Sequence, residues 1–90
     1  MNLSLQGKTA VVCGSTQGIG LAAAIELSKL GATCVLMARN EDALKESILQ
    51  LNNSYNQQHA YVVADFDQPE TVKRAIEHYV LQHPVHVLVN

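Results

Sequence analysis

Three glycines lie within eight residues, in the stretch CGSTQGIG that follows a short apolar run. The glycines are Gly14, Gly18 and Gly20, and the hydroxyl residues Ser15 and Thr16 lie between the first two. In such a turn from strand to helix, glycines permit a sharp bend, close approach of a phosphate and close packing of the helix on the sheet. The helix N-terminus adds free N–H groups, which suit a pyrophosphate. The stretch therefore predicts a dinucleotide site, and the alternative is a glycine-rich turn that binds nothing.

A basic residue lies at the position that usually determines whether such a site binds NAD or NADP. Sites for NAD carry an acid about 20 residues beyond the glycines, bonded to the ribose 2′-hydroxyl. Here Arg39 directly follows an apolar segment that ends at Ala38. A guanidinium suits a 2′-phosphate through paired hydrogen bonds, and Asn40 could add another. This favours NADP over NAD; the alternative is an exposed Arg39 that pairs with Glu41 or Asp42.

Four apolar, strand-like segments alternate with three helical patterns. Strands are expected at Lys8–Cys13, Thr33–Ala38 and His59–Ala64 and in the closing VHVLVN. Helices are expected at Gly18–Leu30, from Glu41 with Leu51 on the buried side, and from Pro69 to a stop at Pro84. This alternation predicts right-handed crossovers and a parallel sheet covered on both faces. The expected fold class is α/β, a Rossmann-like doubly wound sheet.

Residues at the expected helix ends support these bounds. Gly31 suits the C-terminal cap of the first helix, and Asn40 suits the N-cap of the second. Asp67 and Glu70 are spaced as a capping box for the third helix, and Pro69 suits its first turn.

The apolar spacing predicts which face each helix buries. The expected buried residues are Ile19, Ala23, Leu27 and Leu30, then Leu44, Ile48 and Leu51, then Val72, Ala75, Ile76, Tyr79 and Val80. The polar stretch NNSYNQQ between the second helix and the third strand is expected to be a solvated loop.

Composition excludes several classes of protein. The 90 residues suit one small domain, and 48% of them are hydrophobic, which argues against disorder. The net charge is −2 without a basic patch, so nucleic acid is not an expected partner. No apolar run approaches the roughly 20 residues that span a bilayer, and the N-terminus lacks a signal-peptide pattern. A cytoplasmic protein without a membrane partner is expected.

Neither the cysteines nor the histidines form an evident chemical site. Cys13 and Cys34 would lie about four residues out of step on parallel strands, or roughly 13 Å apart. A disulfide needs Cα atoms within about 7 Å, so two free thiols are expected. The histidines are His59, His78, His83 and His86. They show no tight ligand set, and no metal site is predicted.

With these motifs in place, the chain resembles the N-terminal part of the classical short-chain dehydrogenases/reductases. The family fingerprint T-G-x-x-x-G-I-G corresponds to CGSTQGIG here. The strand ends ARN, AD and VLVN and their spacing also match, so the resemblance covers the whole chain. Two positions depart from the pattern: Cys13 replaces a threonine, and Gln17 stands where many NADP-preferring members carry a basic residue.

The resemblance implies roles for individual residues. Those implied to line the pyrophosphate and nicotinamide ribose are Gly14, Ser15, Gly18, Ile19 and Gly20. Arg39 would hold the 2′-phosphate. Asp65 would accept a hydrogen bond from the adenine amino group beside the backbone of Phe66, unless it is a solvated loop acid or a helix cap. Asn90 matches the first asparagine of the family's N-N-A-G motif, at the adenosine side of the site.

The catalytic groups of the family lie beyond this chain. They are a serine and the tyrosine and lysine of a Y-x-x-x-K motif, which does not occur in the 90 residues. No catalytic residue is therefore predicted here. Because the sequence ends inside an expected strand, residues 1–90 are expected to be the N-terminal portion of a Rossmann dinucleotide-binding domain in a longer protein.

The resemblance also implies an activity for that longer protein. It would be an NADPH-dependent reductase that moves a hydride between nicotinamide and a carbonyl or alcohol. The substrate would be a small molecule or an acyl-carrier-linked group, with a 3-oxoacyl thioester as the leading candidate, and the protein would be a homo-oligomer. The alternatives are a non-catalytic NADP-binding module or pseudo-enzyme, and a Rossmann-like domain for another adenosine ligand such as a methyl donor.

Overall fold

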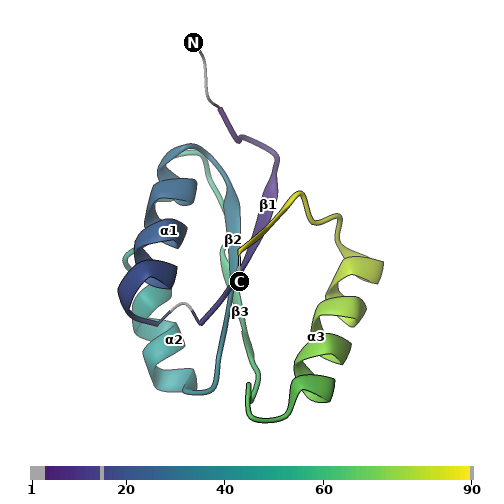
Figure 1. Cartoon of the computed structure of the whole chain (residues 1–90). Coiled ribbons are helices and arrows are strands. Elements are labelled where there is room, and N and C mark those ends of the chain that lie inside the picture. The colour runs from purple at the N-terminus through teal and green to yellow at the C-terminus, as the bar shows by residue number, and fades with distance from the viewer. Residues whose placement is uncertain (1–3, 15, 90) are drawn as a thin grey trace.

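A four-stranded parallel sheet in the order β3-β2-β1-β4 forms the centre of the computed structural model, which describes residues 4–14 and 16–89. The strands are β1 (Thr9–Cys13), β2 (Thr33–Ala38), β3 (Ala60–Val63) and β4 (Val87–Val89). The helices are α1 (Gly18–Lys29), α2 (Glu41–Ile48) and α3 (Pro69–Gln82). Helices α1 and α2 cover one face of the sheet and α3 covers the other (Figure 1). This arrangement confirms the predicted doubly wound α/β fold.

The predicted bounds agree closely with the observed elements. β2 has the predicted bounds, and α3 begins at Pro69 and ends before Pro84. The other strands are shorter than predicted, and β4 begins only at Val87. The caps of the first two helices are also confirmed. Gly31 adopts a φ of +108°, and the side chain of Asn40 accepts a hydrogen bond from the Ala43 N–H at 3.0 Å.

The two inner strands are buried on both faces. Val12 and Leu36 are register partners that belong to the core on the side of α1 and α2. Val11 and Val35, also partners, belong to the core on the side of α3. Two-sided burial explains why these strands read as continuous apolar runs rather than as alternating ones.

The buried face of α1 agrees with the prediction only in part. Leu27 packs against the core and Ala23 is half-buried, as predicted. Ile19 is 88% exposed and Leu30 is also exposed, whereas Ala24 and Ser28 are fully buried. The helix contains apolar residues on most of its circumference, so spacing alone does not identify the buried side. Small side chains decide it, because they let α1 approach β2 closely: the Cys34 thiol lies 3.5 Å from the Ala24 carbonyl oxygen.

Helix α3 differs from the prediction at two places. Val80 is 48% exposed, although its predicted partners Val72, Ala75, Ile76 and Tyr79 do pack against the core. The capping box is absent: the N-cap is Gln68, without a side-chain hydrogen bond. Asp67 lies one residue before the N-cap, in a turn where its N–H bonds to the Asp65 carboxylate. Its own carboxylate contacts Arg39 instead of the helix end.

The polar loop between α2 and β3 is less solvated than predicted. The Asn52 N–H donates to the Ser28 hydroxyl oxygen at 2.9 Å. The Gln57 side-chain amide donates to the carbonyl oxygens of Ser28 and Ala32 at 2.8 and 2.6 Å. The two bonds from Gln57 satisfy carbonyl groups around the C-terminal end of α1, which would otherwise need water or a cap. The loop is therefore fixed to the fold by its own side chains.

Two histidines extend the sheet by side-chain hydrogen bonds. His59 directly precedes β3, and its Nδ1 accepts a hydrogen bond from the Cys34 N–H at 2.9 Å. His86 directly precedes β4, and its Nδ1 accepts from the Thr9 N–H at 3.0 Å. In each case the accepting ring lies one position before the first backbone pair of the outer strand, Ala60 with Val35 or Val87 with Ala10.

We expect His59→Ala to lower the free energy of unfolding by about 1–3 kcal/mol, the range for leaving a buried hydrogen-bonding group unpaired. Since His59 Nδ1 accepts, Nε2 carries the proton and donates to the Asn52 carbonyl oxygen at 2.7 Å. Urea denaturation followed by circular dichroism measures the loss. His78→Ala, at an exposed position on α3, is the matched control and should change stability by less than about 0.5 kcal/mol. Equal losses in the two variants would contradict the role of His59.

Both cysteines are free thiols in different surroundings. Cys34 pairs with Ala10 and Cys13 with Met37, so the two are three residues out of step rather than the predicted four. Cys34 is fully buried, and burial raises the pKa of its thiol from an ordinary value of 9.0 to about 11. Burial also raises the pKa of the half-buried Cys13 thiol.

These surroundings predict the order in which the thiols react. The thiolate is the nucleophile, so at pH 8 iodoacetamide should modify Cys13 slowly and Cys34 only after denaturation. Peptide mass spectrometry against time gives the two rates. Modification of Cys34 as fast as Cys13 in the folded protein would refute this order.

The raised pKa of Cys34 also makes the stability of the fold depend on pH. Between pH 9.0 and about 11 the unfolded state loses the Cys34 proton while the folded state keeps it, so the free energy of unfolding should fall as pH rises in this window.

Candidate functional site

The predicted site residues gather at the carboxyl edge of the sheet. Gly14 follows β1, Arg39 follows β2 and Asp65 lies just after β3. Backbone hydrogen bonds hold these strand ends side by side: the Gly14 N–H donates to the Met37 carbonyl at 2.8 Å, and the Ala64 N–H donates to the Ala38 carbonyl at 2.9 Å. The strand order reverses direction at β1, between β2 and β4. Open α/β sheets bind ligands outside the carboxyl ends at such a point.

The glycine turn has the backbone shape that its sequence predicts. Gly14 has a φ of +67° and Gly18 a φ of +61°, values that other residues rarely adopt. A Cβ atom added at either glycine would meet no heavy atom within 4 Å. Protein packing therefore does not require glycine at these two positions; the backbone conformation does. The turn leaves open space over its backbone, which a side chain would fill.

Within residues 4–14 and 16–89, the first turn of α1 lacks the side-chain partners that α2 has. Its N-cap, Gln17, makes no side-chain cap hydrogen bond, and no acidic residue lies in the turn. By contrast, α2 has Asn40 as a cap and carries Glu41 and Asp42 in its first turn. Uncapped N–H groups and the positive end of the helix dipole favour an anion. The start of α1 is therefore suited to an anion such as a phosphate.

The remaining residues predicted around this turn differ in exposure. Thr16 and Gly20 are half-buried, whereas Ile19 stands in solvent. Ser15 and Asn90 lie outside the described residues.

The Arg39 side chain contacts two acids that follow the neighbouring strand β3. Its Nη1 lies 3.0 Å from Oδ2 of Asp67 and 4.0 Å from Oδ1 of Asp65. The alternative pairing with Glu41 or Asp42 is not what the structure contains: Glu41 instead accepts a hydrogen bond from the Tyr61 hydroxyl at 3.1 Å. The Arg39 side chain remains 70% exposed, so a ligand can reach it.

The other predicted adenosine contacts lie beside Arg39. Asp65 is half-buried, and its Oδ1 accepts a hydrogen bond from the Asp67 N–H. Phe66 is 39% exposed. The Oδ1 atom of Asn40 is taken by the cap of α2, so its amide nitrogen is the group that could reach a ligand. Arg39, Asn40, Asp65 and Phe66 thus surround one end of the sheet edge.

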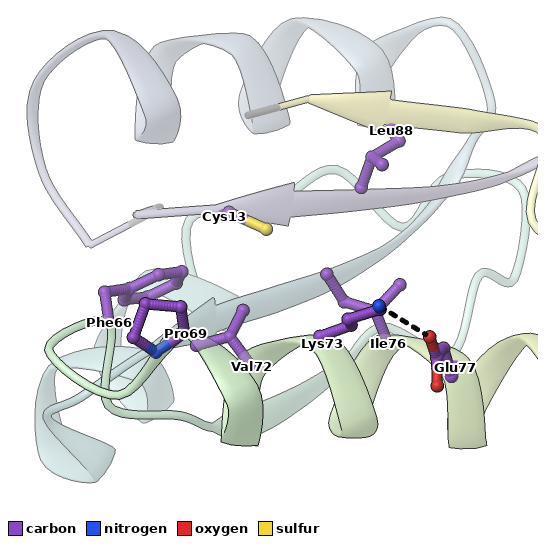
Figure 2. A pocket seen from close by; sticks show the side chains of 8 residues that line it. All are labelled: Cys13, Phe66, Pro69, Val72, Lys73, Ile76, Glu77 and Leu88. Atoms are coloured by element: carbon purple, nitrogen blue, oxygen red, sulfur yellow. Dashed lines mark ion pairs between the residues drawn. The ribbon is translucent and has the colours of Figure 1, made fainter.

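A pocket of about 440 Å³ lies between the sheet and α3. Figure 2 shows Cys13 and Leu88 on the sheet side and Val72 and Ile76 on the helix side. Its two charged lining residues, Lys73 and Glu77, pair with each other at 4.0 Å. The lining is otherwise apolar apart from the Cys13 thiol, so the pocket suits an apolar group and not a phosphate. Of the predicted site residues that the structure describes, only Phe66 lines it.

In the part of the chain that the structure describes, no helix is long and apolar enough to cross a membrane. Within the same residues, no group of three or more histidine, cysteine or acidic side chains could hold a metal ion.

The family model described as short chain dehydrogenase matches residues 8–90. The chain belongs to the short-chain dehydrogenase family. Among curated members of the family, hydroxysteroid dehydrogenase-like protein 1 of Gallus gallus and its Homo sapiens counterpart, named inactive, are each 34% identical over 84 residues, or 93% of this chain. The 3-oxoacyl-acyl-carrier-protein reductase FabG of Pseudomonas aeruginosa is 37% identical over 81 residues, or 90% of the chain.

A solved reductase structure has the same fold. L-sorbose reductase from Gluconobacter frateurii, in a complex with NADPH and L-sorbose, superimposes with a TM-score of 0.84 at 36% identity. The superposition covers all of this chain and 35% of the reductase chain. The chain covers 25%, 26% and 32% of the three curated relatives above. It therefore corresponds to about a quarter to a third of these short-chain dehydrogenases.

Sequence reasoning missed Asp67 as a member of the site. The residue was predicted as a helix cap, and it lies 28 positions from Arg39 in the chain. The only available signal was a D-x-D spacing directly after the third strand, where a carboxylate can face the end of the neighbouring strand.

Proposed function

We propose that residues 1–90 form the N-terminal portion of a Rossmann domain that binds NADP(H), in a protein that transfers a hydride between nicotinamide and a carbonyl or alcohol. One observation carries the proposal: an uncapped helix start behind an open glycine turn lies at the same sheet edge as Arg39. The fold of an NADPH-bound L-sorbose reductase supports the assignment. NAD is the less favoured cofactor.

Different residues along the sheet edge bind different parts of the cofactor. Backbone N–H groups at Gly18, Ile19 and Gly20 bind the pyrophosphate, because the N-cap residue Gln17 makes no side-chain hydrogen bond to them. Gly14 opens the space for it, and Thr16 adds a hydroxyl donor, as Ser15 is also proposed to do. The bound nicotinamide supplies or accepts the hydride, and the protein fixes its orientation.

The adenosine end is held by charge and hydrogen bonds. Arg39 binds the 2′-phosphate, with a contribution from the Asn40 amide. Asp65 accepts a hydrogen bond from the adenine amino group, and the backbone of Phe66 lies beside the ring. Asn90 completes the adenosine side in this proposal.

The proposed substrate is a small carbonyl compound or an acyl-carrier-linked one, with a 3-oxoacyl thioester as the first candidate. Similarity to a 3-oxoacyl-acyl-carrier-protein reductase and to a sugar reductase supports this class. We also propose a homo-oligomer. The free thiols Cys13 and Cys34 support a reducing compartment, so the cytoplasm is the proposed location.

A non-catalytic NADP-binding protein is the second candidate. The name of the human relative, an inactive hydroxysteroid dehydrogenase-like protein, favours it. In this case the same residues would bind the cofactor, and no hydride would move.

Cofactor titration of the natural full-length protein tests both candidates. NADPH should quench tyrosine emission, or release heat, with a dissociation constant at least about tenfold below that of NADH, as expected for a charge-assisted contact. Oxidation of NADPH with a panel of carbonyl compounds then separates the two. Binding without oxidation would favour the second candidate, and absence of binding by either nucleotide would refute the proposal.

A further inference from the structure

The guanidinium of Arg39 faces more negative charge than it carries. Asp67 contacts Nη1 at 3.0 Å and Asp65 lies 4.0 Å from the same nitrogen. Two carboxylates therefore oppose one guanidinium, and the formal charge of this cluster is −1. A 2′-phosphate that reaches Arg39 must approach a group whose charge is already compensated.

The turn between β3 and α3 holds Asp67 in this position. The Asp65 carboxylate accepts a hydrogen bond from the Asp67 N–H at 2.9 Å, and the Asp65 carbonyl accepts one from the Gln68 N–H at 3.0 Å. Pro69 then begins α3. Asp65 thus stabilises the turn, while the Oδ2 atom of Asp67 is the carboxylate oxygen in hydrogen-bond contact with Arg39.

The contact between Asp67 and Arg39 can be replaced by a phosphate. Both side chains are largely exposed, at 81% and 70%, and exposed ion pairs are weak. In its contacts with the described residues the guanidinium uses only Nη1, which leaves other donors for a phosphate. Binding of the 2′-phosphate to Nη1 therefore requires that the Asp67 carboxylate gives up this contact.

We propose that Asp67 is a specificity-determining residue that limits the preference of this site for NADPH over NADH, by competing with the 2′-phosphate for Arg39. This inference rests on the proposed function. It predicts that the carboxylate of Asp67 acts on NADPH and not on NADH, because only NADPH carries the group that needs Arg39.

Asp67→Asn in the full-length protein tests this competition. The substitution keeps the size of the side chain and the backbone N–H that bonds to Asp65, and it removes one negative charge. The dissociation constant for NADPH should fall about two- to fivefold, as expected for an exposed ion pair, while that for NADH changes by less than about twofold. Glu46→Gln, an equal change of charge at an exposed position of α2 outside the first turn, should leave the ratio of the two constants unchanged.

A second variant shows whether Asp67 acts through Arg39. In an Arg39→Ala background, Asp67→Asn should improve NADPH binding by less than it does when Arg39 is present. An unchanged gain would mean that Asp67 acts on the phosphate directly, which would overturn the competition. A weaker NADPH affinity in Asp67→Asn would mean that Asp67 orients Arg39 for the phosphate, which would also overturn it.

These outcomes are distinct from failure of the proposed function. If the unmodified protein binds neither nucleotide, the proposed function itself is wrong. If it binds NADPH and the ratio of the constants is the same in Asp67→Asn, only the competition is wrong.

Discussion

Gly18→Ala is expected to weaken NADPH binding by about 10- to 100-fold, the loss for one hydrogen bond to a charged group of about 1.5–3 kcal/mol. Gly18 has a φ of +61° and open space where its Cβ would lie. A methyl group there occupies the space over the turn that the pyrophosphate needs. The strained backbone also lowers the free energy of unfolding by about 1–2 kcal/mol. Titration with NADPH and urea denaturation measure the two effects separately.

Gly7→Ala is the matched control for this strain. Gly7 has a φ of +79° and nothing within 4 Å of an added Cβ, but it precedes β1 at the amino edge of the sheet. It should lose about the same 1–2 kcal/mol of stability, with no change in NADPH affinity. If both variants lose affinity equally, the effect of Gly18→Ala is a consequence of lower stability and the turn is not a phosphate site.

Arg39→Ala should weaken NADPH binding by about 10- to 100-fold and NADH binding by less than about twofold. The loss comes from the charge-assisted contact between the guanidinium and the 2′-phosphate, which only NADPH can make. Parallel titrations with the two nucleotides measure the difference.

The control for Arg39 is Arg74→Ala, which removes a guanidinium from an exposed position on α3. This variant should bind both nucleotides as the unmodified protein does. An equal loss of NADPH and NADH affinity in Arg39→Ala would remove Arg39 from the 2′-phosphate site. High salt should reduce the effect of Arg39, because its side chain is 70% exposed and is therefore screened.

Local patterns in the sequence were sufficient to predict most of the fold. The buried strand Thr33–Ala38 is a continuous apolar run between a helix-ending glycine and a helix-capping asparagine, so its bounds are defined by its neighbours. The glycine turn could be predicted for the same reason, since conformation and sequence are tied together at Gly14 and Gly18.

Interactions between distant segments could not be predicted. The Asp67 side chain had a valid local role as a cap, and only the paired ends of β2 and β3 bring it to Arg39. The buried side of α1 depends on which small residue lets the helix approach β2, and Ala24 and Ser28 are not marked by hydrophobicity. The bonds from Gln57 to the C-terminal end of α1 likewise join residues more than twenty positions apart.

The imidazole of His59 has a consequence for how the sheet meets other molecules. The ring accepts a hydrogen bond from the Cys34 N–H, one position before the first backbone pair between β2 and β3. That N–H therefore needs no backbone partner, and β3 has only four residues beside the six of β2. β3 is an outer strand of the described sheet. A short outer strand offers few unpaired N–H and C=O groups to a strand from another chain, and this limits aggregation by edge-to-edge pairing.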